Sequence, residues 1–185
     1  MTSRVLGEDG RALALAGCDP AALASLERFV LADAPGRALG PRRDAHVHLG
    51  RDRDGHTLDA DALIADLDAH GIEDAVCFPP NDPGPDGQFA AANAAVLAAS
   101  RRHAGRIVPF CRVDPGSPGA AGAMARAHAG GAMGLKLHPV AQAFRPEGAG
   151  SLAVVCVARD RGWPVLSHAV FGARRLARPF AALAD

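Results

Sequence analysis

The sequence nearly lacks lysine: nineteen of its twenty basic residues are arginine, and Lys136 is the one exception. Twenty acidic residues balance the twenty basic ones, so the formal net charge is zero. No basic stripe with interleaved aromatic residues is present, which argues against a surface for nucleic acid. We therefore expect a small-molecule substrate as the partner and no nucleic acid, and the sequence leaves a homo-oligomer open.

Long apolar runs and paired cysteines are also absent. No apolar segment follows a basic start at the N-terminus, and no uncharged apolar run approaches the length needed to span a bilayer. These absences predict a soluble, cytoplasmic protein with no membrane partner. The four cysteines form no Cys-x-x-Cys pair, and three lie in apolar runs, so we expect neither disulfides nor a structural zinc site.

The chain does contain a regular alternation of β-type runs with stretches of helical spacing. Its 185 residues are 49% hydrophobic, enough for one globular core. The expected strands are 44–49, 74–80, 107–113, 134–139 and 164–169. The expected helices are 59–71, 88–104, 118–130 and 151–162. Alternation of this kind predicts a parallel sheet with crossover helices.

The parallel sheet is expected to belong to a barrel. No Gly-x-Gly-x-x-Gly follows a strand, which disfavours an open nucleotide-binding sheet. Eight units of this length need about 240 residues, and only about five fit here. The prediction is an α/β fold, a TIM-type (β/α)8 barrel that is incomplete. Residues 1–43 would form an N-terminal extension with one helix, at 20–32, and 44–185 a partial barrel whose C-terminal third is missing, ending in a helix that starts at Pro179.

Histidines mark the ends of the first and fifth expected strands. Alternation in a strand predicts that Asp44, His46 and His48 point one way, into the mouth where barrel active sites lie. Two imidazoles at i and i+2 can bind one metal ion, although a hydrogen-bonded structural pair explains them equally well. The fifth strand places His168 at the same mouth. The other four histidines, at positions 56, 70, 103 and 128, are expected in solvated positions.

The fourth strand repeats this pattern with Lys136 and His138 on one face. A lysine that points into a barrel needs a partner or a lowered pKa, and either suits it to substrate binding or proton transfer. The alternative is a lysine that reaches water at the strand end. Arg112, at the end of the third strand, suits a substrate carboxylate, but a structural ion pair is the favoured interpretation there.

The segment 44–50, Asp-Ala-His-Val-His-Leu-Gly, resembles the first-strand signature of the amidohydrolase superfamily, in particular its amidohydrolase-related branch. Residues 134–139, followed by Gln142 and Phe144, and residues 162–168 are similar to the fourth and fifth units of that branch. The resemblance covers residues 44–185. It implies a divalent metal, zinc or alternatively manganese, bound by His46, His48 and His168, with Lys136 and His138 as catalytic residues.

The activity that the resemblance implies is metal-dependent hydrolysis, in which metal-activated water attacks a carbonyl of a C–N or C–O substrate. Three alternatives stay open: a metal-dependent decarboxylase of an aromatic or unsaturated acid, an inactive truncated remnant, and an open α/β sheet with structural histidines. Some binuclear branches use a carbamylated lysine in the strand of Lys136, which is a further hypothesis. The family's strand-six histidine and strand-eight aspartate have no counterpart within these 185 residues.

Overall fold

The structure is a computed structural model that describes residues 5–6, 12–13, 41–85 and 87–168. The chain divides into two compact units, Met1–Pro41 and Arg42–Asp185. In the first unit, β1 (Val5–Leu6) pairs antiparallel with β2 (Ala12–Leu13). The helix expected at 20–32 and the one expected from Pro179 lie outside the described residues.

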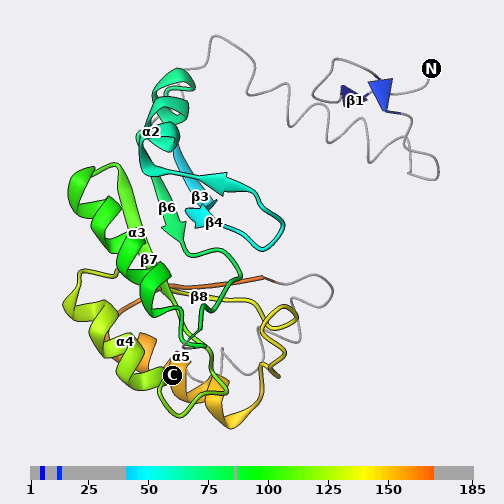
Figure 1. The fold of residues 1–185 in the computed structure, drawn as a ribbon, viewed down its shortest axis with the longest axis vertical. Coiled ribbons are helices and arrows are strands. Elements are labelled where there is room, and N and C mark those ends of the chain that lie inside the picture. The colour runs from blue at the N-terminus through cyan, green and yellow to red at the C-terminus, as the bar shows by residue number, and fades with distance from the viewer. Residues whose placement is uncertain (1–4, 7–11, 14–40, 86, 169–185) are drawn as a thin grey trace. The chain divides into compact units, whose positions relative to one another are not determined.

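The second unit is built on a curled parallel sheet of five strands (Figure 1). The strands are β3 (Arg43–His48), β6 (Asp74–Phe78), β7 (Ile107–Arg112), β8 (Gly134–Leu137) and β9 (Val165–Ser167). Their order in the sheet is their order along the chain. All five predicted strands are confirmed to within two residues at each end. The sheet is a half-barrel, as an incomplete TIM-type barrel would give.

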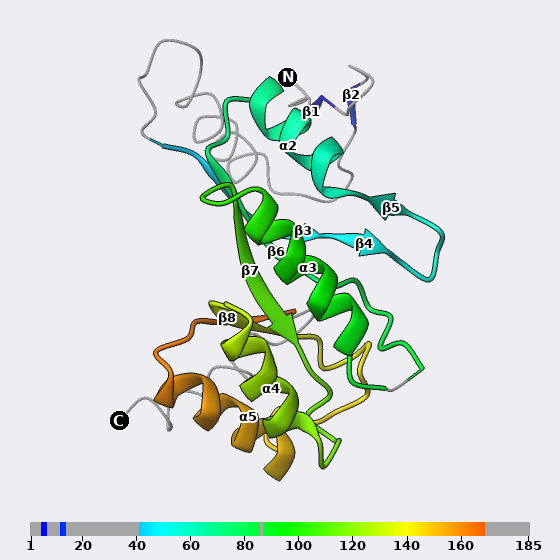
Figure 2. The same cartoon turned by 60° about the vertical axis from the view of Figure 1, so that its left-hand side comes forward.

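Helices connect successive strands and pack on one face of the sheet, as Figure 2 shows for the row formed by the last three. They are α2 (Ala60–Ala69), α3 (Ala90–Arg102), α4 (Ala120–Ala129) and α5 (Ala149–Asp160). Each agrees with a predicted helix to within two residues. Asp59 caps α2, because its side chain accepts a hydrogen bond from the Ala62 amide at 2.8 Å. Among the described residues no helix is both long and apolar enough to cross a membrane.

Two apolar clusters fill the space between the sheet and the helices. Val47, Ala75 and Cys77 pack with residues of α2 and α3 in the first cluster. Cys111 and Leu135 pack with residues of α4 and α5 in the second. Since neighbouring residues of a strand face opposite ways, these contacts fix which side chains are left for the concave face.

The first strand departs from simple alternation. Asp44 lies opposite Ala75 and Val47 opposite Cys77, so three steps along β3 match two along β6. This β-bulge re-aims the residues inside it, as bulges do beside functional sites. After β3 the chain forms a short antiparallel hairpin, β4 (Gly50–Arg51) with β5 (Thr57–Leu58), that the sequence did not predict.

Candidate active site

The concave face of the sheet gathers the polar residues that the sequence singled out. Arg112 and Lys136 are register neighbours on β7 and β8, and both side chains are fully buried. The residues that precede them, Cys111 and Leu135, face the helices. Alternation therefore directs both cations to the opposite, concave face. The burial of Lys136 contradicts the alternative of a lysine that reaches water.

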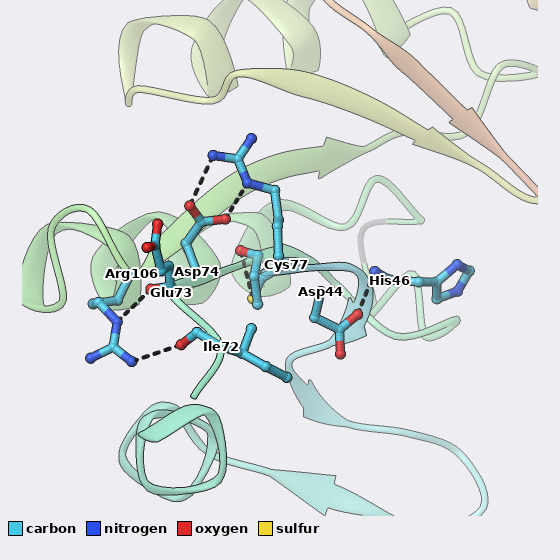
Figure 3. A network of polar contacts seen from close by, with 9 residues as sticks. Asp44, His46, Ile72, Glu73, Asp74, Cys77 and Arg106 are labelled. Atoms are coloured by element: carbon cyan, nitrogen blue, oxygen red, sulfur yellow. Dashed lines mark hydrogen bonds and ion pairs between the residues drawn. The ribbon is translucent and has the colours of Figure 1, made fainter. Parts of the chain in front are cut away.

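His46 and His48 lie beside each other at the end of β3. Their Nε2 atoms lie 3.3 Å apart, and both rings make edge contacts with Phe78, with centroid distances of 5.0 Å for His46 and 4.8 Å for His48. The prediction that Asp44 shares their direction is wrong. Its carboxylate accepts a hydrogen bond from the His46 backbone amide at 2.9 Å, and Figure 3 shows the His46 ring pointing away from it. The reason is the bulge, which breaks the two-residue period.

The separation of the two Nε2 atoms fits a shared metal ion. A tetrahedral zinc with bonds of about 2.0–2.1 Å holds two nitrogen ligands about 3.4 Å apart. A hydrogen bond between the rings would also fit if one Nε2 carried a proton. Burial, with Arg112 as the next cause, lowers the pKa of His48 to about 4, and burial also lowers that of His46. Both rings are therefore neutral at pH 7, the form that binds metal.

His138 and His168 form a second pair at the same end of the sheet. Their rings are stacked, 3.9 Å apart and inclined by 11°. The Ala141 amide donates to His138 Nδ1 at 3.1 Å, so Nδ1 is an acceptor and the neutral ring carries its proton on Nε2. Burial, with His168 as the next cause, lowers the pKa of His138 to about 4. His138 therefore offers one N–H donor, in a fixed tautomer.

The backbone of Arg112 is held by Asn93. The Asn93 side chain accepts from the Arg112 amide at 2.9 Å and donates to its carbonyl at 2.8 Å. At the guanidinium, Nη1 donates to the Pro79 carbonyl at 3.0 Å, and the group lies over the Phe89 ring. The favoured ion pair for Arg112 is wrong, since none forms within the described part of the chain. Strand and loop packing, rather than an acid, hold the side chain.

Lys136 lies over the ring of Phe78, with Nζ 4.6 Å from its centroid. Burial lowers its pKa to about 8, and the nearby charge of Arg112 contributes. Three side-chain atoms of this pair, Lys136 Nζ and Arg112 Nε and Nη2, are buried and have no hydrogen-bond partner in the described structure. His48 Nδ1 shares that condition. Buried polar atoms without a partner are uncommon in folded proteins, and a catalytic role or a bound ion is among the reasons for them.

The predicted site residues therefore lie on one face, in two groups. His46, His48 and Lys136 surround Phe78, and His138 stacks on His168. Residues 41–85 and 87–168 contain no set of three His, Cys, Asp or Glu side chains already placed to hold a metal ion. His56, His70 and His128 are exposed, as predicted, whereas His103 is partly buried and pairs with Asp61 at 3.0 Å.

Two residues organise this face in a way that sequence reasoning did not predict: Phe78 was expected only as a wall of the pocket, and Asn93 was missed. Phe78 is fully buried beneath both histidines and Lys136, and its position opposite His48 in the register was the signal that could have found it. Asn93 is a buried amide on an otherwise Ala-rich helix, and that contrast marked it as unusual. Phe78 packs against three functional side chains, and Asn93 fixes the backbone of Arg112.

Comparison with known proteins shows that the fold of this chain is similar to that of solved structures. No family model matches the chain, and no curated protein matches it. It is similar to the crystal structure of a probable 2-pyrone-4,6-dicarboxylic acid hydrolase from Acinetobacter baumannii with citric acid bound, at a TM-score of 0.52 and 17% identity over 70% of this chain. It is also similar to an Agrobacterium tumefaciens protein solved in its apo form, with a TM-score of 0.49 and 16% identity over 72% of this chain. The chain spans 50% of the length of each. The first likeness establishes the fold alone.

Proposed function

We propose that this chain carries the first part of the active site of a metal-dependent hydrolase of the amidohydrolase type. The observation that carries the proposal is the 3.3 Å separation of the Nε2 atoms of His46 and His48 at the mouth of a parallel half-barrel. The named hydrolase among the similar structures supports the reaction class. Zinc is the metal we expect, with manganese as the alternative.

In this proposal His46 and His48 hold the metal, with His168 as the third ligand. In the described structure His168 stacks on His138 and is not placed with His46 and His48 to hold an ion, so binding requires its ring to move. When bound, a divalent ion supplies the Lewis acidity that activates water near neutral pH and polarises a carbonyl. A neutral imidazole pair suits this role because neither ring must lose a proton before it binds metal.

The remaining residues of the face act on the substrate. His138 presents its Nε2–H in a fixed tautomer, so it can donate a hydrogen bond to a carbonyl oxygen that gains charge. Lys136 adds a positive charge on the same face. Phe78 forms an apolar floor against one side of both rings, and its low polarity strengthens the polar interactions beside it.

Zinc binding tests the proposal without an assay of activity. Isothermal titration of metal-free protein with Zn²⁺ should show one site per chain, and His46→Ala should weaken it at least tenfold. His70→Ala is the matched control, because that histidine is exposed at the end of α2. Equal affinity of wild type and His46→Ala would refute the proposed pair, as would an equal loss in His70→Ala.

The third ligand has its own test. His168→Ala should weaken zinc binding, and the stack with His138 should open when zinc is added to the wild type. Histidine side-chain NMR signals report both events, because binding and loss of stacking shift the ring protons. A zinc-saturated wild type whose His138 and His168 signals do not move would refute the assignment of His168.

A further inference from the structure

Two buried cations lie side by side on the concave face, and no acidic residue among those that the structure describes pairs with them. Arg112 and Lys136 are register neighbours and are both fully buried, so water cannot compensate their charges. In the described part of the chain neither makes an ion pair. Burial lowers the pKa of Arg112 to about 10, and Asp52 opposes this shift without forming an ion pair with Arg112. Burying like charges together is costly unless an anion joins them.

The unpartnered atoms of Arg112 define the shape of the group that would fit beside them. Nη1 is used by the Pro79 carbonyl, which leaves Nε and Nη2 free. Those two nitrogens share one edge of the planar guanidinium, the edge that matches the two oxygens of a carboxylate. Asn93 fixes the backbone from which this edge projects, through hydrogen bonds of 2.9 and 2.8 Å. The free edge is therefore held in a defined place.

Lys136 completes the arrangement from the neighbouring strand. Its Nζ has no hydrogen-bond partner in the described structure and rests on the face of Phe78. His46, which is exposed, packs on the same ring. Lys136 therefore lies one aromatic ring away from the exposed His46.

We propose that Arg112 and Lys136 form a carboxylate-binding subsite, and that the substrate of the hydrolase proposed above is an organic acid. The carboxylate lies across the Nε–Nη2 edge of Arg112 and accepts a further hydrogen bond from Lys136 Nζ. The bond to be broken then lies toward His46 and His48. That the acid is a substrate rests on the proposed function, whereas the subsite itself rests on the two cations.

Binding of glutarate tests the subsite. Isothermal titration at pH 7 compares glutarate with glutaramide, the uncharged diamide of the same length, in protein treated with a chelator and in zinc-loaded protein. We expect glutarate to bind at least tenfold more tightly than glutaramide in both. Lys136→Met, which keeps the chain length, should abolish that preference. Arg126→Gln removes an exposed charge from α4 and should leave it unchanged.

Several outcomes would overturn the inference. These are no detectable glutarate binding by the wild type, equal binding of acid and diamide, and a Lys136→Met variant that keeps the wild-type preference. Tighter binding of phosphate or bicarbonate than of glutarate would overturn the assignment to an organic acid. Arg112→Gln should act like Lys136→Met. Its circular dichroism is recorded to check that it folds, and the lysine variant alone decides the matter.

The two proposals fail separately. A protein that prefers glutarate but does not bind zinc would keep the subsite and refute the metal-dependent function. A protein that binds zinc through His46 but does not distinguish glutarate from glutaramide would keep the metal-dependent function and refute the subsite. Lys136→Met should still bind one zinc ion per chain with no loss of affinity, because no proposed metal ligand is changed and a positive charge near His46 and His48 is removed.

Discussion

Replacing Gly134 by alanine should destabilise the second unit through a single steric contact. Gly134 lies opposite Phe110 in the register, and a Cβ built on it would meet three atoms of that ring at 2.5–2.6 Å. No pair of carbon atoms tolerates this distance, so the ring must move. Phe110 is only 6% exposed, and its neighbours leave it little freedom. Over-packing of this kind costs about 1–3 kcal/mol in the free energy of unfolding.

The matched control is the same substitution at Gly122. That residue is exposed within α4, and a Cβ there would meet its nearest neighbour, Arg126 Nη1, at an ordinary 3.5 Å. Alanine at such a helical position should stabilise by about 0.5–1 kcal/mol, because it restricts the unfolded chain. Two chemically identical changes should therefore shift urea unfolding in opposite directions, with similar m-values.

A smaller side chain at position 110 provides the decisive comparison. In a Phe110→Leu background the ring is gone, so Gly134→Ala should cost less than in the wild type. A double-mutant cycle then gives a coupling energy of about 1 kcal/mol or more between the two positions. The reasoning would be refuted by a Gly134→Ala protein as stable as wild type, or by a penalty that persists unchanged in the leucine background.

Two further predictions concern the buried cations. Asn93→Ala should lower the free energy of unfolding by about 2–4 kcal/mol, since it leaves the buried amide and carbonyl of Arg112 without partners; a urea midpoint equal to wild type would contradict this. Folding lowers the pKa of Lys136 from 10.5 to about 8, mainly through burial, so between these two pH values the unfolded chain binds more protons than the folded one. The free energy of unfolding should therefore rise from pH 8 to about 10.5, by at most about 3 kcal/mol. Urea midpoints across this range should flatten in Lys136→Met, and an unchanged slope would contradict the assignment.

The sequence predicted the elements well because each is locally encoded. Hydrophobic spacing and turn residues located the five parallel strands and the helices between them to within two residues. Asp59 caps α2 through its own side chain, and Gly71, with φ of +62°, follows the helix in a conformation that glycine favours. Signals of this kind need no knowledge of the partner strands.

The site was harder to predict because its details depend on register. The bulge in β3 arises from pairing with β6, so alternation along the first strand alone placed Asp44 on the wrong side. The ion pair expected for Arg112 assumed an acidic neighbour, whereas the fold supplied a carbonyl and an aromatic ring. Phe78 could be recognised only once it stood opposite His48.

The order of the strands also bears on how the chain acquires this structure during synthesis. Because β3, β6, β7, β8 and β9 pair in the sequence in which they are made, each new strand meets a partner that has already left the ribosome. The loop to be closed is about thirty residues each time, so the entropic cost stays small and nearly constant. The first apolar cluster can form around α2 before α4 and α5 exist. Folding can therefore proceed one strand and one helix at a time, from β3 onward.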